Sequence, residues 1–183
     1  MKRRSLFLGL LAYLVSGAVQ AEDVGVVGAK FAVGMFTNCV KYAGDPAGLR
    51  EWISESGMKP APSDLAAQYL GGHPGKVFGG EGPAGVVAIG SQDDGGCTLF
   101  ADSADSDATF QAFEEWLSKS KLSYAQKPAE KRSEGKLSME SRDYEVTGSG
   151  RRWRIVVSTS PQGKGRFQAI MTAYGTPADP EKH

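Results

Sequence analysis

The sequence predicts a single α+β domain, in which an antiparallel sheet of about five or six strands has its helices packed on one face. Early in the chain, apolar residues are spaced three and four apart, as in amphipathic helices. Later, apolar and polar residues alternate, as in half-buried strands. Helices followed by strands are typical of α+β folds, and the length of 183 residues suits one domain.

The first 21 residues have the layout of a cleavable secretory signal. A basic tip at residues 2–4 precedes an apolar run at residues 6–15, and a small-residue cleavage site ends at Ala21. This layout predicts a mature protein that begins near Glu22 and is periplasmic or secreted. The apolar run is shorter than the roughly 20 residues of a membrane span, and an acylated lipoprotein would need Cys at position 21. We therefore expect no membrane anchor.

Charge is spread unevenly along the expected mature chain. Loss of residues 1–21 removes three cations and no anions, which leaves 18 Lys and Arg against 21 Asp and Glu. Residues 22–110 have 5 Lys and Arg against 12 Asp and Glu, whereas residues 111–183 have 13 against 9. Two such parts either generate a dipolar surface or are the solvated faces of one fold.

Three helices are expected at the start of the domain, over residues 22–72. The first, at residues 24–42, has the apolar stripe Gly28, Phe31, Ala32, Met35, Phe36, Cys39 and Val40. Asp45 is placed to cap a second helix with Pro46 in its first turn. A third helix starts at residues 62–64, and Gly71 with Gly72 predicts its end.

A hairpin and a fourth helix follow. The seven glycines of residues 71–85 favour turns around a short strand at residues 76–78. The apolar runs at residues 86–90 and 97–101 are joined through Asp94 and Gly95, which predicts a hairpin. Asp105 or Asp107 is expected to cap a helix with the apolar stripe Phe110, Phe113, Trp116 and Leu117.

Three further strands are expected after an exposed connector at residues 125–135. In the first, the apolar phase changes near residues 141–143, which predicts a bulge or turn. In the second, residues 153, 155, 157 and 159 share one face, while Arg152 and Arg154 lie on the other. The last aligns Phe167 with residues 169, 171 and 173. The domain is expected to end at residue 174, before a loose tail at residues 175–183.

The two cysteines, Cys39 and Cys97, predict a disulfide between the first helix and the hairpin, because an exported chain meets an oxidising compartment. The chain-entropy model gives such a bridge about 4 kcal/mol of stabilisation. Two sulfurs on their own cannot complete a four-ligand zinc site. We expect no metal and no cofactor.

No arrangement of residues in the sequence amounts to a catalytic site. The histidines are His73 and His183, and Cys39 lies late in a helix instead of at an N-terminus that could lower its thiol pKa. Asp102, Asp105 and Asp107 are better placed for capping than for binding calcium. An acid pair brought together in a cleft stays open as an alternative.

Five cations near the end of the chain are the candidate binding residues. They are expected to cluster at one end of a hairpin as a patch for an anionic partner, in which arginine contacts carboxylate or phosphate: Arg151, Arg152, Arg154, Lys164 and Arg166. The alternative is a polar outer sheet face that deters edge pairing. Nucleic acid is a poor partner for a net-negative chain without interleaved basic and aromatic residues.

The features of residues 24–117, from Phe31 and Cys39 to the hairpin at residues 94–97, resemble small exported bacterial proteins of uncharacterised families. Those proteins have a signal peptide and one cysteine pair, so the resemblance implies an exported location and no known activity. We expect a non-enzymatic binding protein whose partner is an envelope or secreted protein, as for immunity or inhibitor proteins and accessory subunits. The alternative hypothesis is a hydrolase of envelope polymers.

Overall fold

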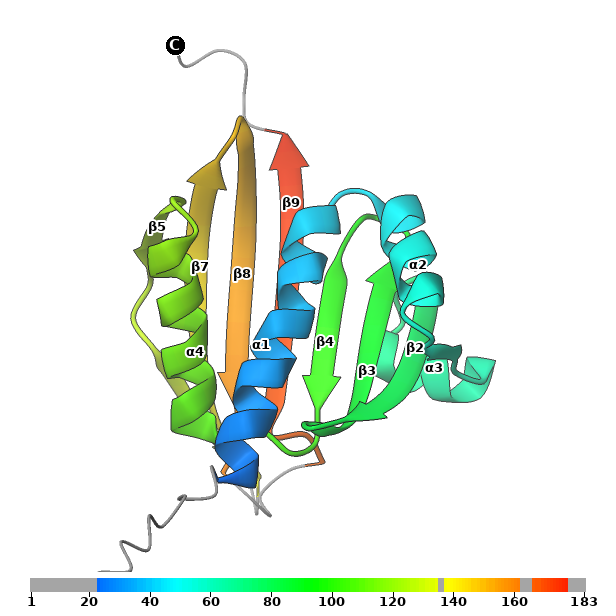
Figure 1. Ribbon diagram of the computed structural model, residues 1–183, viewed down its shortest axis with the longest axis horizontal. Helices are drawn as coiled ribbons and strands as arrows, with labels where there is room; N and C mark the ends of the chain where they lie inside the picture. Colours follow the sequence, from blue (N-terminus) through cyan, green and yellow to red (C-terminus); the bar gives the residue numbers. More distant parts are fainter. Residues whose placement is uncertain (1–22, 135–136, 162–165, 178–183) are drawn as a thin grey trace, which may run out of the picture.

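The computed structural model describes residues 23–134, 137–161 and 166–177. The predicted signal at residues 1–21 and the last part of the predicted tail, residues 178–183, lie outside the described residues. Within them the chain is an α+β domain with four helices and a nine-stranded antiparallel sheet (Figure 1). The fold class is as predicted, but the sheet has more strands than the expected five or six.

Each of the four described helices coincides with a predicted one: α1 (Val24–Tyr42), α2 (Pro46–Glu55), α3 (Ser63–Leu70) and α4 (Ser106–Lys119). Asp23, Asp45 and Asp105 cap α1, α2 and α4, and each carboxylate accepts a backbone N–H of the first turn at 2.7–3.0 Å. These N–H groups have no partner inside the helix. Gly71 ends α3 in the left-handed conformation, with φ of 58°.

The strands in chain order are β1 (Lys59–Pro60), β2 (Gly75–Gly82), β3 (Gly85–Gln92), β4 (Cys97–Ala101), β5 (Ser123–Gln126), β6 (Glu130–Glu134), β7 (Leu137–Gly148), β8 (Arg151–Thr159) and β9 (Ala169–Pro177). Their order in the sheet is β1-β2-β3-β4-β9-β8-β7-β5, and β6 also pairs with β7. The strands β2, β3 and β4 therefore form one antiparallel meander, and β7, β8 and β9 form a second one. The two meanders join where β4 pairs with β9.

Three strand boundaries differ from the prediction. β2 spans eight residues, so the glycines after Phe78 belong to a strand and not to a turn. β9 continues to Pro177, three residues beyond the predicted end of the domain. Residues 125–135, predicted to be a connector, include the end of β5 and β6, whose described side chains are exposed.

The irregularity predicted near residues 141–143 does not lie in β7 itself. It lies between β5 and β6, the two edge strands that pair with β7. β7 pairs with β8 without interruption from Glu140 to Gly148. The register slips by one residue between the pairs Gln126↔Tyr144 and Glu130↔Ser141, at Pro128, which has no N–H to donate. The apolar phase changes within β7 because Tyr144 is buried in the core, whereas Met139 lines a hollow on the other face.

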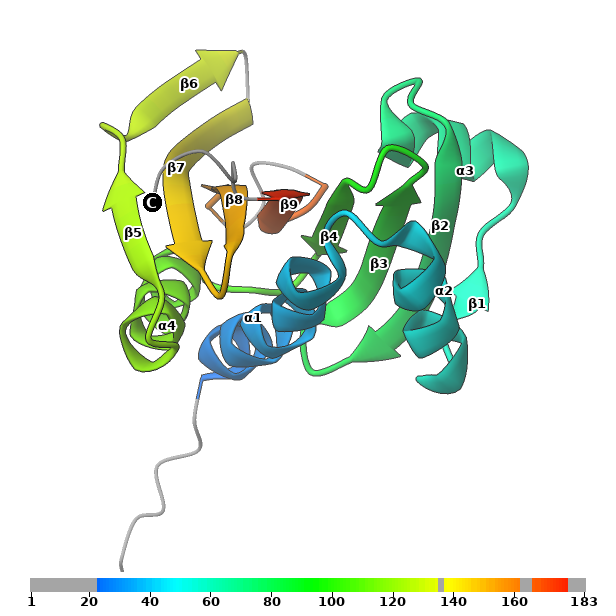
Figure 2. The same ribbon diagram turned by 90° about the horizontal axis from the view of Figure 1, so that it is seen from above.

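The main core lies between the sheet and the helices α1, α2 and α4, which cover the same face (Figure 2). Cys39 of α1 and Cys97 of β4 are 0% exposed, and their sulfur atoms are 1.94 Å apart with Cα atoms 5.3 Å apart. This confirms the predicted disulfide. Burial of the apolar side chains of this core stabilises the fold by about 25 cal/mol per Å² of apolar surface removed from water.

A second, smaller core lies on the opposite face of the sheet, where α3 packs over Val77, Ala88 and Phe100. The helices therefore cover both faces, and the prediction of helices on one face is wrong. Phe167 packs against this second cluster, so it does not share the face of Ala169 and Met171 as expected. No helix in the described part of the chain is apolar over a length sufficient to cross a membrane.

Candidate functional site

The face of β7, β8 and β9 that points away from α1 and α4 carries a row of polar side chains. We call this surface the outer face and define it by the residues Ser141, Asp143, Glu145, Arg152, Arg154, Val156, Ser158, Thr172, Tyr174 and Thr176. These positions alternate with buried ones such as Trp153 and Ile155, because successive strand residues point to opposite faces. On this side, β6 and α3 project from the two ends of the sheet (Figure 2).

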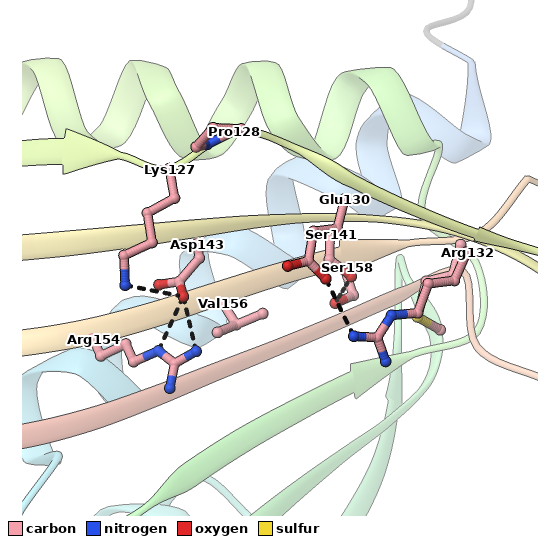
Figure 3. A pocket seen from close by; sticks show the side chains of 10 residues that line it. Lys127, Pro128, Glu130, Arg132, Ser141, Asp143, Arg154, Val156 and Ser158 are labelled. Atoms are coloured by element: carbon pink, nitrogen blue, oxygen red, sulfur yellow. Dashed lines mark hydrogen bonds and ion pairs between the residues drawn. The ribbon is translucent and has the colours of Figure 1, made fainter.

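The first hollow in the outer face, of about 420 Å³, lies where β5 and β6 meet β7 and β8. Asp143 is central to it (Figure 3). Its Oδ2 accepts hydrogen bonds from Nε and Nη2 of Arg154 at 3.1 and 2.8 Å and lies 3.6 Å from Nζ of Lys127. The Lys127 ammonium is also 3.0 Å from Oε1 of Glu145.

These contacts favour the charged form of both cations. Hydrogen bonding to Asp143 raises the pKa of the Arg154 guanidinium, and hydrogen bonding to Glu145 raises the pKa of the Lys127 ammonium. Each opposite charge favours the ionised form of its partner. The charges of the first hollow therefore compensate one another within the chain.

Most of the remaining polar groups of the first hollow are also paired, but Oδ1 of Asp143 is buried and has no hydrogen-bond partner among the described residues. The hydroxyls of Ser141 and Ser158 are 2.8 Å apart, and Arg132 donates to Glu130 at 3.2 Å. Both lining carboxylates, Glu130 and Asp143, are therefore engaged by cations. Hydrolysis by an acid pair requires one carboxyl group that stays protonated with a raised pKa. The geometry of this hollow suits binding better than it suits general acid catalysis.

A second hollow of about 210 Å³ lies between β7, β8 and β9, and Arg152, Arg154, Glu145, Tyr174 and Thr176 line it. Tyr174 is 39% exposed. The cross-strand neighbours of Arg152 are Thr147 and Thr176, both uncharged. The Arg152 side chain is exposed and, among the residues that the structure describes, makes no hydrogen bond, ion pair or ring contact.

The five predicted patch residues do not form one patch. Arg152 and Arg154 lie together on the outer face, whereas Arg151 points to the helix side and donates to the carbonyls of Lys41 and Ala43. The Arg166 guanidinium is 5.3 Å from the ring centroids of both Tyr69 and Phe167, next to α3. Lys164 lies outside the described residues.

Two residues of the candidate site were not identified from the sequence. Lys127 lies in the segment predicted as a connector, and only the pairing of β5 with β7 brings it to Asp143. Tyr174 lies across from Arg154 in the pairing of β8 and β9. The one sequence signal that could have indicated its outward side chain is the alternation of apolar and polar residues along β9. The neighbouring Ala173 is buried, so Tyr174 points the other way.

Glu114, Arg142 and Tyr144 form a polar cluster on the helix side. Arg142 donates to Oε1 of Glu114 at 2.7 Å and lies 3.8 Å from the centroid of the Phe110 ring. The Tyr144 hydroxyl donates to the same oxygen at 3.2 Å, and burial raises the pKa of this phenol. These contacts join α4 to β7, which is a structural role.

The other residues considered for catalysis or metal binding from the sequence stabilise the fold or lie in a turn. Asp102 accepts the N–H of Val86 at 2.8 Å, and Asp105 is the cap of α4. His73 is exposed in the turn after α3. Cys39 and Cys97 are bonded to each other, so neither is a thiol nucleophile. In the described segments, no three His, Cys, Asp or Glu side chains come together as a metal site would require.

A scan against known protein families finds no match for the chain, and a search of curated proteins finds no relative. The outer face and its two hollows are therefore the features of this chain that bear on its function.

Proposed function

We propose that this chain is an exported, non-enzymatic binding protein that engages an envelope or secreted protein through the outer face. The observation that supports this most directly is Arg152, an exposed arginine without a partner in the described structure, beside the exposed Tyr174. Arginine and tyrosine are enriched at protein interfaces and in the residues that contribute most binding energy.

The disulfide supports the exported part of the proposal. Disulfides form and persist in oxidising compartments and are rare in the cytosol. The bridge between Cys39 and Cys97 is compatible with such a compartment, and it agrees with the signal-like layout of residues 1–21. An exported binding protein of this size matches immunity proteins, inhibitors and accessory subunits of envelope assemblies.

Photo-crosslinking in the cells that produce the protein tests this function. A benzoylphenylalanine replaces Tyr174 on the outer face or, as a matched control, Tyr124, which is 45% exposed on β5. The Tyr124 ring is 6.4 Å from that of Tyr144 and therefore lies on the helix side. We expect one defined protein adduct from position 174 and none from position 124.

The variant Arg152→Glu in the position-174 crosslinker background supplies the second comparison. We expect the adduct to fall at least about tenfold, because charge reversal replaces an attractive contact with a repulsive one. The absence of an adduct at position 174, or adducts of the same mass at both positions, would contradict the proposal. An adduct that is unchanged in Arg152→Glu would also contradict it.

A further inference from the structure

We infer that the second hollow of the outer face is a receptor for a side-chain carboxylate, an Asp or Glu in a segment of the protein partner, and that Arg152 binds it. This inference deepens the proposed function and rests on it.

The register of β7, β8 and β9 separates Arg152 from the other arginine of the outer face. Arg154 lies across from Glu145 and donates two hydrogen bonds to Asp143. Opposite charges across strands stabilise a sheet, so Arg154 has an internal role. Arg152 has threonines on both sides, and its guanidinium donors have no acceptor within the described residues. A carboxylate matches such a free guanidinium with two parallel hydrogen bonds.

The dimensions of the hollow favour a side chain over a small-molecule ligand. Its volume of about 210 Å³ is below the range of about 300–1,000 Å³ that is typical of ligand pockets. The Tyr174 and Thr176 side chains line it beside Arg152. They supply an aromatic surface for the methylene groups of an acidic side chain and hydroxyl groups for its oxygens.

The charges around the hollow leave one cation uncompensated. Glu145 lines the hollow but is paired with Lys127, and Asp143 is bonded to the neighbouring Arg154. The remaining positive charge, that of Arg152, is neutralised by one singly charged carboxylate. A phosphate group carries a charge of about −1.5 to −2 at neutral pH, which this single cation does not neutralise.

The test is an NMR titration of the mature chain with three probes. The first is an acetylated, amidated tetraglutamate peptide, the second is the tetraglutamine peptide of equal length, and the third is inorganic phosphate. We expect saturable shifts of the Arg152 Nε–H and of the Thr176 amide with tetraglutamate. Tetraglutamine should bind at least about tenfold more weakly, since charge-assisted hydrogen bonds are about twice as strong as neutral ones. Phosphate should also bind more weakly, because its charge of about −1.5 to −2 exceeds that of Arg152 and because it has no methylene groups to contact Tyr174.

Two variants localise the binding. Arg152→Gln should weaken tetraglutamate binding at least about tenfold, because it removes the charged bidentate donor. Lys119→Gln is the control, since Lys119 is 72% exposed on α4, on the helix side of the sheet, and is paired with Glu115. It should leave the affinity within about twofold if surface charge in general contributes little.

Several outcomes would overturn the inference. These are equal binding of tetraglutamine, equal or tighter binding of phosphate, unchanged affinity in Arg152→Gln, or the same loss in Lys119→Gln. The crosslinking experiment separates this failure from failure of the proposed function. A specific adduct at position 174 together with no carboxylate preference would retain the partner-binding role and remove its assigned chemistry.

Discussion

Arg151 and Arg152 are consecutive residues of β8, and their side chains lie on opposite sides of the sheet. Arg151 donates from Nη1 to the carbonyl of Lys41 at 3.1 Å and from Nη2 to the carbonyl of Ala43, at the end of α1. Arg152 lies on the outer face with Tyr174. This separation follows from strand geometry, and it divides one predicted patch into a structural residue and a candidate binding residue.

We therefore expect Arg151→Gln to lower the stability of the folded protein and Arg152→Gln to leave it unchanged. Arg151 satisfies carbonyl groups that have no partner inside α1, and such contacts contribute about 1–2 kcal/mol. For a domain of this size, the melting temperature Tm should fall by about 2–8 °C. Arg152→Gln should shift it by less than about 2 °C. Thermal unfolding by circular dichroism measures both, and equal shifts would contradict the assignment.

The Cys39–Cys97 bridge predicts a larger effect on stability. The two residues are separated by 58 positions, for which the chain-entropy model gives about 4 kcal/mol. Tm of the Cys39→Ala, Cys97→Ala double variant should fall by about 8–16 °C. Reduced wild-type protein is the control, because it lacks the cross-link but keeps both side chains. If reduction leaves the urea midpoint unchanged, the bridge does not stabilise the fold.

The helices and the hairpin could be predicted because their signals lie within a few residues of the structures they form. Asp45, Asp105 and Gly71 act on the adjacent helix end, and caps of this kind are local contacts. β5 and β6 could not be predicted in this way. Their described side chains are exposed, so no apolar alternation marks them, and their hydrogen bonds depend on β7.

The candidate site was predictable only where one strand determines it. Alternation along β8 places Arg152 and Arg154 on the same face, as expected. The contact of Lys127 with Asp143 depends on the pairing of β5 with β7, and Arg166 packs with Tyr69 through the position of α3. These are tertiary relationships between distant segments, which local patterns do not specify.

Tyr144 predicts a change in stability at alkaline pH. The side chain is 0% exposed, burial raises the pKa of its phenol, and the nearby Glu114 carboxylate acts in the same direction. The folded pKa therefore exceeds the unfolded value of about 10. The corresponding stabilisation is fully present below pH 10 and is lost as the pH rises towards the folded pKa.

The comparison of wild type with Tyr144→Phe isolates this effect. The urea midpoint of wild type should fall more steeply above about pH 10 than that of Tyr144→Phe, which has no phenol to ionise. Below that pH, the variant should be less stable by about 1 kcal/mol, because it loses the hydrogen bond to Glu114. The control Tyr124→Phe, at a 45% exposed position, should keep the wild-type slope. Identical slopes for wild type and Tyr144→Phe would show that ionisation of this phenol does not govern alkaline unfolding.

Two glycines of α1 predict stability changes of opposite sign. A Cβ atom at Gly28 would lie 1.9 Å from the carbonyl oxygen of Ser103, whereas a Cβ at Gly34 would meet no atom within 4 Å. Gly28→Ala should therefore displace α1 from the loop before α4 and cost about 1–3 kcal/mol, the usual range for overpacking. Gly34→Ala should stabilise by about 0.5–1 kcal/mol, because alanine restricts the unfolded chain and favours helix.

Urea unfolding of the two single variants, measured against wild type, gives both signs under the same conditions. Because Gly28 and Gly34 lie in the same helix, any general effect of alanine on helix formation is common to both variants. The contacts of a Cβ at Gly28 with Ser103 and with the backbone of Ala84 distinguish them. Stabilisation by Gly28→Ala equal to that by Gly34→Ala would mean that α1 does not approach the loop at Ser103 closely. The packing of α1 against this loop would then need revision, while the register of the sheet beneath the outer face would be unaffected.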